Sequence, residues 1–169
     1  MYIAPRKGKF EMIEWKPELS VGHLALDDDH KAFFSLAALL NDIEASDADE
    51  EMVVLSAISL LQEYVTGHFL REEMAMRSAK YPATDTHISE HVQFKQQVLS
   101  IIDDFNQGNA GAAHALGELT AKWLYQHIMS TDLKYVDWVE DKDVDSRPLG
   151  LMLADYGRND DHDVDLLNP

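Results

Sequence analysis

Two pairs of residues, one of histidine with glutamate and one of two histidines, stand at a spacing that would bring their side chains together on helices. His68 precedes Glu72 by four residues, and His87 precedes His91 by the same interval. Four residues advance an α-helix by about 400 degrees, so both members of each pair would project from one face, one turn apart. Imidazole and carboxylate groups at this spacing are typical of a metal site.

Single residues of the same types occur before and after these pairs. His30 lies within an apolar stripe upstream, and His127 precedes Asp132 by five residues. A lone histidine is more often hydrogen-bonded than metal-bound, and single pairs arise by chance on exposed helices. Five inward-facing histidines without a metal, however, would leave many buried ring nitrogens without partners. The candidate metal ligands are therefore His30, His68, Glu72, His87, His91, His127 and Asp132.

The number of candidate ligands indicates how many metal ions they would hold. Five imidazoles and two carboxylates exceed the roughly six donors that one ion accepts, and they suit two ions joined by bridging carboxylates. An imidazole-rich set favours iron, zinc or copper, whereas magnesium and calcium prefer oxygen ligands.

Four helices would have to position these side chains. Apolar residues recur at helical intervals in four blocks, and no block shows the alternation of a strand. The blocks cover residues 24–44, 49–78, 84–108 and 111–140. Short connections favour antiparallel neighbours, so the sequence predicts an all-α, up-down-up-down four-helix bundle over residues 24–140.

Two further segments flank this predicted bundle. Residues 1–23 form an N-terminal arm, and residues 141–169 form an acidic C-terminal extension whose apolar run, 149–153, could dock on the bundle. Because every candidate ligand precedes residue 141, we expect removal of the extension to leave metal content nearly unchanged.

The spacing of the last two ligands does not fit a regular helix. Five residues place Asp132 about 140 degrees round the helix axis from His127, although both would serve one site. Ser130 and Thr131 lie between them and could hydrogen-bond displaced carbonyl groups. We therefore predict a local widening of the fourth helix, of the π-bulge type.

Composition excludes several classes of function. The formal net charge of -17 disfavours nucleic acid and membrane surfaces as partners. The absence of cysteine excludes disulfides, thiolate metal sites and a cysteine nucleophile. No signal peptide or membrane-spanning apolar run is evident, so a cytoplasmic location is expected.

The order of the ligands resembles that of the hemerythrin family. The pattern is His, then His-x-x-x-Glu, then His-x-x-x-His, then His-x-x-x-x-Asp, and it is complete here. The flanks agree too. Trp15 and residues 20–22 precede the first helix, residues 72–74 stand at the end of the His-x-x-x-Glu pair, and residues 123–128 precede the aspartate. The resemblance covers roughly residues 10–139, and His23 departs from it by replacing an aliphatic residue.

The resemblance implies a centre of two unequal irons. One iron would be held by His87, His91 and His127, and the other by His30 and His68. Glu72 and Asp132 would bridge them, together with an oxo or hydroxo group. Dioxygen would bind at the open position of the two-histidine iron. Candidate walls of its apolar pocket lie within one turn of ligands; these are Phe33, Phe34, Leu124 and Ile128.

The function that follows from this resemblance is reversible dioxygen binding for storage, transport or delivery to an oxygen-consuming protein. One alternative is a sensor that reports the oxygen or redox state of the centre to a partner. Another is a di-iron oxidase, peroxidase or nitric-oxide-consuming enzyme. We expect a binding protein and not an enzyme, because oxygen-activating di-iron sites are usually rich in carboxylates.

Overall fold

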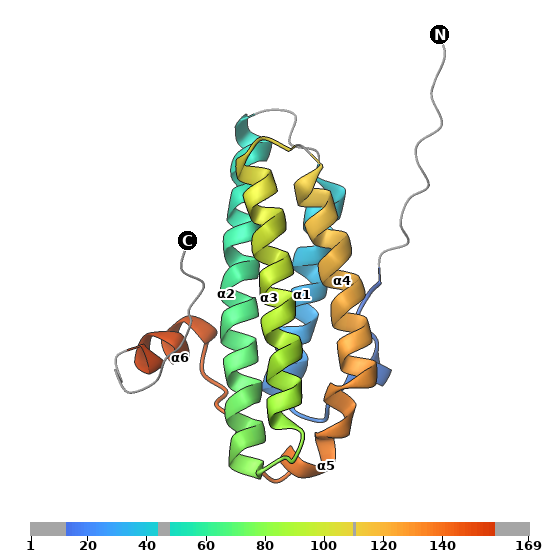
Figure 1. Cartoon of the computed structure of the whole chain (residues 1–169), viewed down its shortest axis with the longest axis vertical. Coiled ribbons are helices and arrows are strands. Elements are labelled where there is room, and N and C mark those ends of the chain that lie inside the picture. Colours follow the sequence, from blue (N-terminus) through green and yellow to red (C-terminus); the bar gives the residue numbers. More distant parts are fainter. Residues whose placement is uncertain (1–12, 44–47, 110, 158–169) are drawn as a thin grey trace.

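Four long helices form the body of the protein (Figure 1). The structure is a computed structural model, and it describes residues 13–43, 48–109 and 111–157. They are α1 (Leu24–Asp42), α2 (Ala48–Ala79), α3 (Thr84–Asn106) and α4 (Ala112–Ser130). Each runs antiparallel to the next, α1 packs on both α2 and α4, and α3 packs on the same two helices. The predicted all-α, up-down-up-down four-helix bundle is confirmed. Residues 1–12 of the predicted arm and 158–169 of the predicted extension lie outside the described part of the chain.

The described part of the N-terminal arm is fixed to the first turn of α1. It contains a short 3₁₀ helix, η1 (Pro17–Leu19), and Leu19 is fully buried in the core. The Asp27 carboxylate accepts hydrogen bonds from the Ser20 hydroxyl at 2.5 Å and from the Val21 amide at 2.8 Å. A buried carboxylate in the first turn suits the positive end of the helix and holds the chain entering it.

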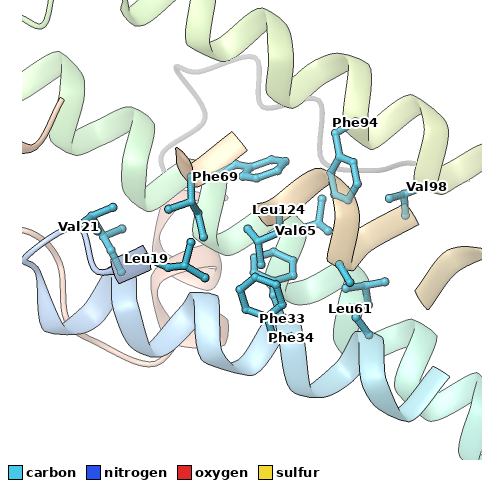
Figure 2. Packing of buried hydrophobic residues seen from close by; sticks show 14 of the residues in the cluster. Leu19, Val21, Phe33, Phe34, Leu61, Val65, Phe69, Phe94, Val98 and Leu124 are labelled. Atoms are coloured by element: carbon cyan, nitrogen blue, oxygen red, sulfur yellow. The ribbon is translucent and has the colours of Figure 1, made fainter. Parts of the chain in front are cut away.

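Helix α2 is the most apolar of the long helices over part of its length. An 18-residue window within residues 51–79 has a mean hydropathy of 1.3, so by length and composition alone this helix could cross a bilayer. Within that window, 56% is buried inside the protein. The apolar character of α2 therefore serves the bundle interior, where Leu61, Val65 and Phe69 are fully buried (Figure 2).

The fourth helix does not follow the predicted course. Instead of one helix over 111–140 with a π-bulge, α4 ends at Ser130, and Thr131 leaves helical geometry with φ -130 and ψ -57. A 3₁₀ helix, η2 (Asp132–Lys134), and a short helix, α5 (Val136–Val139), follow. The predicted bulge is wrong, because a break in the helix, not a widened turn, changes the direction of Asp132.

Helices α1 and α4 approach so closely that only glycine fits between them at position 117. A Cβ atom added to Gly117 would lie 2.6 Å from the Ala37 carbonyl oxygen and 3.0 Å from the Asn41 amide nitrogen. Both are backbone atoms, so the two helices would have to separate to accommodate it. His30 and His127 are carried by these same helices, so this packing also sets the spacing of the candidate ligands.

We expect Gly117→Ala to destabilise the protein by about 1–3 kcal/mol, as overpacking of a core does, despite the better helix propensity of alanine. Urea unfolding followed by circular dichroism measures the effect. Gly111→Ala is the control, since the nearest atom to its added Cβ is an Asn109 side-chain oxygen at 3.5 Å. Equal stability of the two variants would contradict the prediction.

Candidate metal centre

All seven candidate ligands converge inside the bundle. His30 comes from α1, His68 and Glu72 from α2, His87 and His91 from α3, His127 from α4, and Asp132 from η2. None is more than 4% exposed. The two four-residue pairs each present both side chains inward, as their spacing predicts. The structure thus brings every candidate ligand to one buried site.

The ligand atoms fall into two groups that share one residue. Four of them, from Glu72, His87, His91 and His127, lie within 4.8 Å of one another. A second group, from His30, His68 and Glu72, meets the same limit. Each group has the dimensions of a site for one metal ion, and Glu72 belongs to both.

The Glu72 carboxylate lies between the two groups. Its Oε2 is 3.2 Å from His91 Nε2, and 3.6 Å from the Nε2 atoms of both His68 and His87. One oxygen therefore faces imidazoles from either side, which is the position of a bridging ligand.

Asp132 spans the groups in the same way. Its Oδ1 is 3.0 Å from His127 Nε2 and 3.4 Å from His87 Nε2, whereas its Oδ2 is 3.7 Å from His30 Nε2. The two oxygens thus point to different halves of the site. The break at Thr131 makes this possible, because it turns Asp132 back towards the interior.

Unpartnered polar atoms show that these residues fit a metal centre. Among the described residues, both ring nitrogens of His30, Oε2 of Glu72 and both carboxylate oxygens of Asp132 are buried without a hydrogen-bond partner. Although Asp132 Oδ1 lies near His127 Nε2, the two are not aligned as a hydrogen bond. Such atoms are costly to bury, and coordination of a cation would satisfy them.

The electrostatics favour the ligating forms of two key residues. Burial, aided by His68, lowers the pKa of His30 from 6.5 to about 4, so its imidazole is neutral at physiological pH. Burial opposes ionisation of Glu72, but the histidines around it, His68 first, hold its pKa well below the ordinary value. A neutral imidazole and an ionised carboxylate are the forms that bind metal.

Carboxylates outside the ligand set orient three of the imidazoles. Asp29 Oδ2 lies 3.2 Å from His68 Nδ1, Glu73 Oε1 lies 3.0 Å from His91 Nδ1, and Glu90 Oε2 lies 3.0 Å from His127 Nδ1. Each contact fixes a ring and leaves its Nε2 directed at the centre. Reasoning from the sequence missed these three residues.

A signal for these carboxylates was nevertheless present in the sequence. Asp29, Glu73 and Glu90 are each next to a candidate ligand in the chain. Each reaches across to the ligand on the following helix, from α1 to α2, from α2 to α3 and from α3 to α4. An acidic residue beside a ligand in a bundle is therefore a candidate partner for the ligand on the next helix.

Aromatic side chains line the centre on several sides. Phe69 stacks on the His91 ring at 3.8 Å, Trp123 stacks on His127 at 4.2 Å, and Phe33 meets His68 edge-on at 5.4 Å. The predicted wall residues are all buried; they are Phe33, Phe34, Leu124 and Ile128. Their role as walls of a ligand pocket stays a prediction, and Phe69 is a neighbour that the sequence did not single out.

Tyr135 is a further neighbour that the sequence did not single out. Tyr135 is fully buried, and its hydroxyl donates a hydrogen bond to Oε1 of Glu72, whereas Oε2 is the oxygen close to His68, His87 and His91. Burial, together with the charges of Glu72 and Asp132, raises the pKa of Tyr135 well above 10. The hydroxyl therefore keeps its proton and serves as a fixed donor to Glu72.

Replacing Tyr135 by phenylalanine is expected to lower metal affinity roughly 10–100-fold, as loss of an outer partner of a ligand does. A hydrogen bond donated to a carboxylate favours its ionised form, so losing the bond raises the pKa of Glu72. Metal should then be lost at a higher pH than in the parent protein. Competition with a chelator across a pH series measures this shift, and Tyr125→Phe, on the partly exposed side of α4, is the control.

Known proteins with similar sequences and folds place this geometry in context. The model of the hemerythrin HHE cation-binding domain matches residues 22–139. The chain is 30% identical to a bacteriohemerythrin of Pseudomonas paraeruginosa over 125 residues, which cover 74% of this chain and 80% of the relative. It is 28% identical to a myohemerythrin of Theromyzon tessulatum over 126 residues, covering 74% and 92%.

Comparison of structures gives the same fold. A solved crystal structure of a mutant protein matches with a TM-score of 0.68 at 23% sequence identity. The match covers 78% of this chain and 99% of the other. The bundle is therefore common to both proteins, while part of the present chain lies outside the shared region.

Proposed function

The chain belongs to the hemerythrin family, and on that premise we propose that it binds dioxygen reversibly at a centre of two non-heme irons. Hemerythrins are a di-iron, oxygen-binding family. The observation that carries the proposal is the pair of donor groups that share Glu72 inside a closed bundle. A single-ion site would not explain why Asp132 also presents one oxygen to each group.

The two groups are unequal, and this inequality supports a division of roles. His87, His91 and His127 would hold one iron, and His30 and His68 the other, with Glu72 and Asp132 as bridges beside an oxo or hydroxo group. The two-histidine iron has fewer protein ligands, so it is the one with a position open to dioxygen. When bound, the iron pair supplies the two electrons that dioxygen takes up reversibly.

The residues around the centre suit binding better than catalysis. Phe33, Phe34, Leu124 and Ile128 are at most 4% exposed, and such apolar walls exclude water. Tyr135 donates its hydrogen bond to Glu72 and resists deprotonation because it is buried beside two carboxylates. A dry site whose neighbouring Tyr135 hydroxyl retains its proton disfavours release of reduced oxygen products, so we propose a carrier or store and not an enzyme.

Repeated oxygenation tests this proposal. The iron-loaded protein is reduced without oxygen, exposed to air, and returned to oxygen-free conditions while its visible spectrum is followed. We expect two irons per chain and a spectrum that alternates between two states over several cycles. Oxidation in the first cycle with release of peroxide would show an oxidase, and one iron per chain would contradict the shared-ligand site.

A further inference from the structure

The C-terminal segment beyond the part of the chain matched to the family is docked on α2 beside the candidate metal centre. Residues after 139 lie outside the region matched to the family. Val144 is buried in the main core, and α6 (Leu149–Tyr156) packs on α2 (Figure 1). Leu149 and Met152 form a small buried cluster with Leu70 of α2. We call residues 144–156 the strap.

The strap packs against a glycine that is next to a candidate ligand in the chain. A Cβ atom added to Gly67 would lie 2.9 Å from Leu149 Cβ and 3.0 Å from its Cδ2. The strap therefore lies directly against the backbone of α2, one residue before His68. Any larger residue at position 67 would displace α6, because the base of the Leu149 side chain and not only its tip is in the way.

A buried arginine joins the strap to the histidine. Arg71 is 4% exposed, and its Nη1 donates to Asp29 Oδ2 at 2.5 Å. Its Nη2 donates to the backbone carbonyl of Arg147 in the strap, also at 2.5 Å. The same Asp29 oxygen lies 3.2 Å from His68 Nδ1. An unbroken line of polar contacts thus runs from the strap through Arg71 and Asp29 to His68.

The strap presents its carbonyl from a turn that is itself held in place. The Arg147 amide donates a hydrogen bond to Asp145 Oδ1 at 3.0 Å. The Arg147 guanidinium donates hydrogen bonds to Asp145 in the same turn and to Asp155, which is on α6. A cavity of about 330 Å³ lies beside this turn, lined by Asp29, Arg71 and Arg147 among others. If the strap left, Arg71 would lose a partner and water would reach the Asp29–Arg71 pair.

We propose that Arg71 is a positioning residue through which docking of the strap fixes the orientation of His68. This inference rests on the proposed function in that His68 is taken as a ligand of the more open iron. It goes beyond that function because it links a segment outside the family region to one half of the centre. It also competes with the expectation from the sequence that removing the extension leaves metal content nearly unchanged.

Coupling of this kind acts in both directions. If a docked strap strengthens metal binding, then bound metal must hold the strap more firmly by the same factor. Partners of a ligand outside the coordination shell typically change metal affinity 10–100-fold. Metal loading should therefore slow the opening of the strap by about tenfold or more, although the strap itself contributes no candidate ligand.

Amide hydrogen exchange of α6, with and without iron, tests the coupling in the full chain. In the parent protein we expect exchange over 149–156 to slow by about tenfold or more on iron loading. In Gly67→Ala and in Arg71→Gln, exchange of α6 should be the same with and without iron. Arg71→Lys should restore little of the iron-dependent slowing, because lysine cannot contact both Asp29 and the Arg147 carbonyl. Leu151→Ala, at an exposed position of α6, is the matched control and should behave like the parent.

A second readout does not depend on iron. In the metal-free protein, the ring nitrogens of His68 are observed by ¹⁵N NMR, with Nδ1 expected to carry a slowly exchanging proton in the parent and an averaged signal in Gly67→Ala. If two irons bind yet α6 exchange is unchanged, the coupling is refuted while the proposed function stands. If iron fails to bind, the proposed function fails, and an unaltered His68 spectrum in Gly67→Ala would refute the coupling separately.

Discussion

Glu72→Gln is expected to lose both metal ions, so that iron falls from two per chain towards none. Oε2 of Glu72 faces histidines of both groups, at 3.2 Å from His91 and 3.6 Å from His68, and Glu72 belongs to both groups of ligand atoms. The amide keeps the shape of the side chain but removes its charge and replaces one oxygen by a donor. The drop in affinity should exceed the roughly 10–100-fold effect of outer partners. Metal analysis and the visible spectrum measure the loss.

The control for this variant is Glu51→Gln, an exposed carboxylate on the same helix. It removes one charge from α2 without touching the centre, so it should retain both irons. Far-ultraviolet circular dichroism of both variants shows whether the bundle is folded. A folded Glu72→Gln protein that keeps two irons would mean that Glu72 is not a shared ligand.

His30→Ala is expected to abolish reversible oxygenation while leaving about one iron per chain. His30 belongs to the two-histidine group and lies 3.7 Å from Asp132 Oδ2, whereas the group of His87, His91 and His127 does not include it. Removing one of only two imidazoles should empty that half of the site. The remaining iron would lack the second metal that reversible electron transfer to dioxygen requires.

The matched comparison for His30→Ala is His114→Ala, since the His114 side chain is 52% exposed and contacts the Asn41 carbonyl at 3.1 Å and Glu118 at 3.5 Å, away from the centre. Iron content and spectral cycling should be unchanged there. His127→Ala should produce the opposite loss, at the three-histidine half. Full oxygen cycling by His30→Ala would show that the open position belongs to the other iron.

The bundle and the convergence of its ligands could be foreseen because both depend on helical periodicity. His68 and Glu72, or His87 and His91, share a face on any regular helix, and the apolar stripes decide that this face is buried. Asp132 lies beside the candidate histidines, as its spacing suggested, but a different backbone geometry brings it there. Spacing shows that a regular helix must fail there, whereas only tertiary packing decides between a widened turn and a break.

The parts that the sequence did not reveal are contacts between helices. The pairing of Asp29 with His68 depends on how far α1 is shifted along its axis relative to α2, and no local sequence pattern encodes that shift. The packing of Leu149 against Gly67 depends on where a short apolar run docks on a helix surface 82 residues earlier in the chain. The docking of residues 149–153 was suggested by their apolar character, but the link through Arg71 to the centre was not.

The break after Ser130 limits how this site could be rebuilt in a designed protein. Five of the seven side chains stand on α1, α2 and α3, so they could be copied onto straight, idealised helices at their present spacing. His127 and Asp132 could not, because a continuous helix would carry the aspartate to its outer side. A designer would have to transplant residues 127–135 as one irregular unit, including the Tyr135 that reaches Glu72. The segment least like an ideal bundle is thus the one that a minimal scaffold must preserve.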